Sequence, residues 1–162
     1  MTLDPTLREA NIRDSVVKYF VDNINTTSGV PLTFDKSLSV PKVTGKQASQ
    51  VDRWVNIDFG TLITDILSSQ VLQIYVCTRK DNEGFRLAQL RDTVFGYLFD
   101  SDDTYLNGMR IPFYKSDSRG HSFWTLIGAF MVQDVDEGPR MEAGDETKFK
   151  ILTVRLRFAS KG

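Results

Sequence analysis

The chain has 162 residues, a formal net charge of −1 and 41% hydrophobic residues, which is typical of one soluble globular domain covering residues 1–162. The balanced charge argues against a dedicated nucleic-acid-binding protein, because such proteins usually carry a strongly basic face. The single cysteine, Cys77, excludes an internal disulfide. Since no apolar run approaches the roughly 20 residues that span a bilayer, we expect no membrane contact and synthesis in a cytosol.

The first third of the chain predicts a helix, a short strand and a long loop. Apolar residues recur at helical spacing from Val16 to Ile24, which predicts a helix over residues 5–25. Residues 30–35 predict a strand at a sheet edge, because Pro31 cannot donate a backbone hydrogen bond. Residues 36–50 show no periodicity and predict an exposed loop.

Two strands are predicted in the middle of the chain. Residues 51–60 alternate between apolar and polar side chains, which is typical of a half-buried strand. Residues 61–70 are predicted to be an apolar connector. Residues 71–78 carry apolar side chains on both faces, so we expect a strand that is covered on both sides.

The remaining chain predicts a helix and three strands. A polar turn at residues 81–84 precedes the amphipathic pattern of a helix that ends near residue 99. The three strands are expected at residues 109–114, 123–132 and 148–158, with an acidic exposed loop at residues 133–147. Pro112 favours an edge position for the first of these strands.

This order predicts an α+β fold, with a two-layer arrangement of a mainly antiparallel β-sheet flanked by two α-helices and joined by long loops. If both helices cover one face of the sheet, the other face carries aromatic side chains that a monomer would expose. We therefore expect a subunit interface on that face. The residues predicted to form it are Trp54, Tyr75, Trp124 and Phe130.

Candidate chemistry is sparse. His121 is the only histidine, and Cys77 lies among apolar neighbours, so neither predicts a metal site or a nucleophile. Asp81 and Glu83 occupy a turn where acids normally cap the following helix. We expect no catalytic residue, no cofactor and no metal, and therefore no enzyme. A small metal-dependent nuclease built around Asp58 is the alternative from another functional class.

Four segments resemble tail terminator proteins of bacteriophages with long non-contractile tails, the siphoviruses. They are Ile12-Arg-Asp-Ser-Val-Val-Lys-Tyr-Phe20, Val30-Pro-Leu-Thr-Phe-Asp35, Arg53-Trp-Val-Asn-Ile-Asp-Phe-Gly60 and the strand–turn–helix at 71–99. The last begins Val71-Leu-Gln-Ile-Tyr-Val-Cys-Thr-Arg-Lys-Asp-Asn-Glu-Gly84. The similarity extends over nearly the whole chain in the order of its elements.

The resemblance implies a structural virion protein. Such a protein assembles as a hexameric ring on the last ring of the tail tube, stops tube polymerisation and forms the interface to the head or neck. The expected partners are other copies of the chain, the tail tube protein, a neck or head-completion protein, and double-stranded DNA that passes through without sequence specificity. The expected location is the head-proximal end of the virion tail, after assembly in the host cytoplasm.

Within this reading, residues 36–50, 61–70 and 133–147 are predicted to contact partners. Arg155 and Arg157 share one strand face and are predicted to line the lumen or an intersubunit surface. The nearest alternative is another head–tail connector, such as a neck or head-completion protein.

Overall fold

The computed structural model describes residues 9–36, 38–63, 67–101, 106–116, 124–144 and 146–159. The helical elements are α1 (Glu9–Phe20), the π-helix η2 (Val21–Thr27) that continues it, the 3-10 turn η3 (Ala48–Gln50) and α2 (Phe85–Gly96). The strands are β1 (Leu32–Phe34), β2 (Arg53–Ile63), β3 (Leu67–Thr78), β4 (Phe99–Ser101), β5 (Leu106–Gly108), β6 (Arg110–Ser116), β7 (Trp124–Glu137), β8 (Met141–Glu142) and β9 (Lys148–Ala159).

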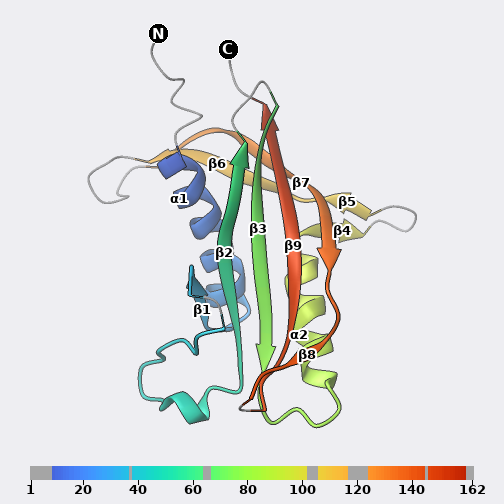
Figure 1. Cartoon of the computed structure of the whole chain (residues 1–162). Helices are drawn as coiled ribbons and strands as arrows, with labels where there is room; N and C mark the ends of the chain where they lie inside the picture. The colour runs from blue at the N-terminus through green and yellow to red at the C-terminus, as the bar shows by residue number, and fades with distance from the viewer. Residues whose placement is uncertain are drawn as a thin grey trace.

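The main sheet has the strand order β1-β2-β3-β9-β7-β6, with β8 paired to the end of β9. All of its pairs are antiparallel except β1 with β2. β6 and the first half of β7 curve across the other strands on the helix side, so the sheet curls (Figure 1). The predicted α+β fold with a mainly antiparallel sheet and two α-helices is confirmed.

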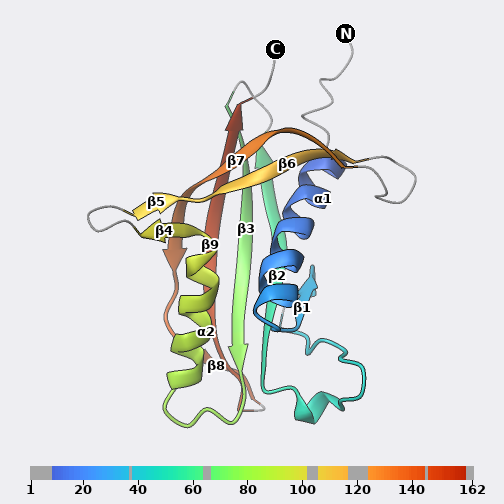
Figure 2. The same ribbon diagram turned by 180° about the vertical axis from the view of Figure 1, so that it is seen from behind.

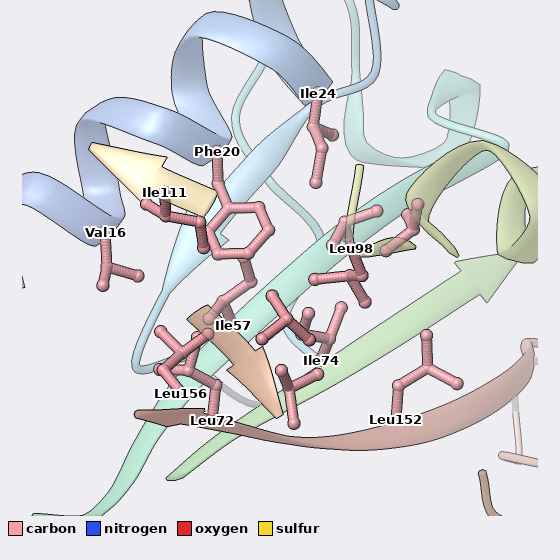
Figure 3. Close-up of a cluster of buried hydrophobic side chains, with 14 of the residues drawn as sticks. Val16, Phe20, Ile24, Ile57, Leu72, Ile74, Leu98, Ile111, Leu152 and Leu156 are labelled. Carbon is pink, nitrogen blue, oxygen red and sulfur yellow. The ribbon is translucent and has the colours of Figure 1, made fainter. Parts of the chain in front are cut away.

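Both helices pack on the same face of the sheet, which we call the inner face; the opposite face is the outer face (Figure 2). α1 packs against β6, η2 contacts β1, and α2 packs against β3 and β9. Their apolar side chains meet those of the strands in one core. Figure 3 shows Phe20 of α1 directed at Ile57, Leu72 and Leu156 of the sheet, all with no exposed surface.

The edge strand β6 is protected by α1. The buried Ser15 hydroxyl accepts a hydrogen bond from the Tyr114 amide (2.8 Å) and donates one to the Tyr114 carbonyl (3.2 Å). These are backbone groups that an edge strand otherwise leaves unpaired. The predicted edge position of this strand is confirmed, and Pro112 lies within it.

Two predicted boundaries are wrong. Residues 61–63 belong to β2 and residues 67–70 belong to β3. The sequence did not indicate this, because a bulge at Gly60 interrupts the alternation of apolar and polar side chains along β2. The buried Gln70 amide stabilises the bulge by donating to the carbonyls of Gly60 (3.1 Å) and Val71 (2.8 Å). The predicted loop at 133–147 begins as strand, since β7 extends to Glu137. The first four residues of the predicted helix 5–25 lie outside the described residues.

Candidate functional site

The outer face is half covered by the chain itself. The segment 38–43 packs Leu38, Val40 and Val43 onto a cluster that contains Trp54 and Cys77. Trp54 has no exposed surface. The premise that a monomer exposes this side chain is therefore wrong, because the predicted exposed loop lies over it.

A buried asparagine holds this segment in place. Asn56 accepts a hydrogen bond from the indole of Trp54 (3.0 Å) through its carbonyl oxygen. Its amide nitrogen donates to the carbonyl of Ser39 (3.0 Å) and to the hydroxyl of Thr33. Asn56 has no exposed surface, so each of these bonds satisfies a polar group that burial would otherwise leave unpaired.

The other predicted interface residues have different surroundings. Phe130 has no exposed surface and packs between Phe113 and Phe158 in the inner core, so the premise that a monomer exposes it is also wrong. Its side chain points inward because the alternation of β7 places Met131, 47% exposed, on the outer face. Tyr75 is half-buried at the margin of the Trp54 cluster. The Trp124 side chain lies outside what the structure describes.

Arg155 and Arg157 lie on the uncovered half of the outer face. Both are exposed, and the Arg155 guanidinium contacts the carboxylate of Asp134 on β7 at 3.5 Å. Arg157 is paired across the sheet with Met131 of β7 and Ser69 of β3. Their predicted position on a face directed away from the core is confirmed, and their predicted role at a lumen or an intersubunit surface stays a prediction.

The turn after β3 holds the N-terminus of α2. The buried Asp81 carboxylate accepts hydrogen bonds from the backbone amides of Leu87 (2.9 Å) and Arg86 (3.3 Å) and from the Thr78 hydroxyl (3.2 Å). Burial alone would raise the pKa of this carboxyl, but the three hydrogen bonds outweigh that effect and hold the pKa below its ordinary value. The predicted capping role of Asp81 is confirmed.

Among the described residues, no three His, Cys, Asp or Glu side chains lie close enough together to hold a metal ion. His121 lies outside the described residues. Asp58 is half-buried on the outer face, opposite Gln73 of β3. Burial raises the pKa of the Cys77 thiol to about 12, which leaves almost no thiolate near neutral pH.

A cleft that sequence reasoning missed opens on the helix side, between α2 and the segments 28–31 and 43–53. Its volume is about 710 Å³. Val30, Val51 and Leu90, which are almost fully buried, form its apolar floor. Its exposed rim carries three cations, Lys46, Arg53 and Arg86, and we call the whole feature the basic cleft.

Only one carboxylate of the lining offsets these cations. Asp52 contacts the Arg86 guanidinium at 3.2 Å, whereas Arg53 forms no ion pair with any described residue. Arg53 occupies an inward position of β2, two residues before the buried Val55. Arg53 shares the alternation of the buried residues Val55 and Ile57, and a charged residue in such an apolar position was the one sequence signal that could have indicated the cleft.

No helix among the described residues is long and apolar enough to cross a bilayer. No protein-family model matches the chain, and no curated protein matches its sequence. The solved structures that are similar to this protein include one that matches over 96% of this chain and 98% of its own. The TM-score is 0.58 at 13% sequence identity, so this similarity concerns the fold alone.

Proposed function

We propose that the protein is a structural subunit of a bacteriophage tail, a terminator that closes the tail tube as a ring and forms the surface to which the neck or head attaches. The observation that carries the proposal is the sequence resemblance over residues 12–20, 30–35, 53–60 and 71–99, which follows the order of the elements in the chain. In this proposal the protein performs no catalysis and has a hexamer as its working form.

The arrangement of the layers supports this proposal. Both helices lie on the inner face. The half of the outer face that the segment 38–43 does not cover is therefore open to contact with neighbouring molecules. Met131, 47% exposed, is paired with Arg157 there, and Ile63, 53% exposed, lies in the same row beyond Ser69. An exposed mixture of apolar and charged side chains is typical of a protein contact surface.

The test uses tail tubes assembled from purified tube protein. We expect the protein to bind one end of each tube and to stop its elongation, which electron microscopy measures as tube length against time. Attachment to isolated heads without any effect on tubes would instead support the alternative of a neck or head-completion protein.

The nuclease alternative has its own measurement. Incubation of the protein with double-stranded DNA and Mg²⁺ or Mn²⁺ should leave the DNA intact. Metal-dependent cleavage that is lost in an Asp58→Ala variant would overturn the proposal of a purely structural protein.

A further inference from the structure

A second charged surface lies on the other side of α2 from the basic cleft. It consists of carboxylates near the end of β7 and in β8, namely the half-buried Asp134 and the exposed Asp136, Glu137 and Glu142, and we call it the acidic strand end. Glu137 contacts Arg91 of α2, whereas the cleft is lined by Arg86, Gln89 and Thr93 of the same helix. The two surfaces therefore do not overlap.

The charge of the chain is divided between these two regions. Residues 36–53 contain four Lys or Arg and one Asp, whereas residues 133–146 contain six Asp or Glu and one Arg. The net charge of the whole chain is only −1. Opposite charges on two separate surfaces of one chain attract each other between copies, and like surfaces repel.

The acidic strand end also offers backbone groups. β6 pairs with β7 only as far as Met131, and the Val132 amide donates to the Met109 carbonyl (3.1 Å). Beyond Val132, this edge of β7 has no strand partner in the part of the chain that the structure describes. Carboxylates along such an edge discourage unspecific strand pairing, so they favour a partner that brings cations.

We propose that the basic cleft of one copy binds the acidic strand end of the next copy. Because the two surfaces are different, each copy can use both at once, and the contact is heterologous: it adds subunits head to tail and closes into a ring if the rotation permits. The inference rests on the proposed ring function and assigns the two surfaces that meet. Arg53 faces the carboxylates of the neighbouring copy.

Two charge reversals test the contact without any tail component. Arg53→Glu damages only the cleft, and Asp136→Arg damages only the strand end; both side chains are exposed and lack an ion pair with any described residue. We expect wild-type protein to associate in sedimentation experiments at concentrations up to about 1 mM. We expect each variant alone to associate at least tenfold more weakly.

The mixture of the two variants is decisive. The Arg53→Glu protein keeps an intact strand end and the Asp136→Arg protein keeps an intact cleft, so an equimolar mixture should form a complex that neither variant forms alone. The matched controls are Arg110→Glu on β6 and Glu9→Lys at the start of α1, exposed charges outside both surfaces, which should associate as the wild type does.

A wild-type protein that remains monomeric at 1 mM overturns the inference, and so does a mixture that fails to recover the complex. Equal loss of association in the two controls also overturns it, because it would indicate a general charge effect. These outcomes are separate from those of the tube assay. If the protein caps tubes but the charge reversals have no effect, the proposed function stands and the proposed contact does not. If the protein associates through this contact but does not cap tubes, the contact stands and the proposed function does not.

Discussion

At the scale of single residues, the carboxylate of Asp81 joins the end of β3 to the start of α2. It lies three residues before the N-cap Gly84, whose positive φ of 75° is a conformation that favours glycine. The first helical turn contains no acidic residue, so Asp81 supplies the negative charge that the helix N-terminus favours.

We predict that Asp81→Ala lowers the free energy of unfolding by about 1–2 kcal/mol at neutral pH, the usual cost of a lost capping side chain. Because the folded state holds the pKa of Asp81 below its ordinary value of 3.8, the contribution is complete above that value and is lost as the pH falls towards the folded-state pKa. Urea unfolding of wild type and variant between pH 7 and pH 2.5 measures this difference. Glu83→Ala, exposed in the same turn, should stay within about 0.5 kcal/mol of wild type.

A second prediction concerns Cys77. Its thiol has no exposed surface and, through burial, a pKa of about 12. We expect no reaction with a thiol-specific reagent at pH 8 in the folded protein and complete reaction in denaturant, measured by absorbance of the released product. Rapid labelling of the folded protein would contradict the packing of this thiol under the segment 38–43.

At the scale of elements, the sequence predicted the strands and helices that follow one clear period and missed what depends on contacts between distant segments. The alternation of residues 51–60 and the amphipathic pattern from Leu87 to Leu98 both correspond to observed elements. The bulge at Gly60 broke the alternation and hid a hairpin. The segment 38–43 has no period of its own, so nothing local indicated that it covers Trp54.

The position of that segment depends on Asn56. We predict that Asn56→Ala releases it, because the change removes the bonds to Ser39 and Thr33 and leaves the Trp54 indole unpaired, at a cost of about 1–3 kcal/mol. Limited trypsin digestion measures the release as faster cleavage after Lys42 and Lys46, about tenfold for each 1.4 kcal/mol of easier local opening.

The matched control for this variant is Asn82→Ala in the exposed turn before α2, which should digest like the wild type. Faster cleavage in both variants would indicate global destabilisation, and unchanged cleavage in Asn56→Ala would show that the apolar contacts of the segment hold it without the asparagine.

At the scale of the whole molecule, the sequence could indicate which face of each element is apolar but could not place the elements relative to one another. The basic cleft combines residues from Ser28, which follows η2, to Thr93 of α2, which are 65 positions apart in the chain. Only the structure shows that the acidic strand end lies beyond α2. The net charge of the whole chain does not reveal this division, because the excess of cations in residues 36–53 offsets much of the excess of carboxylates in residues 133–146.

The inner core connects these regions, and Phe20 lies at its centre (Figure 3). We predict that Phe20→Ala lowers the free energy of unfolding by about 3–5 kcal/mol, because it leaves a cavity between α1 and the sheet. The loss should appear equally in helix circular dichroism and in tryptophan fluorescence, since Trp54 on the outer face and the helices on the inner face share the strands β2 and β3. Phe85→Ala, the same substitution at a side chain that is 67% exposed, should change stability by less than about 0.5 kcal/mol. Two separate transitions in the wild type would contradict a single cooperative domain, because the covering segment and the core would then unfold independently.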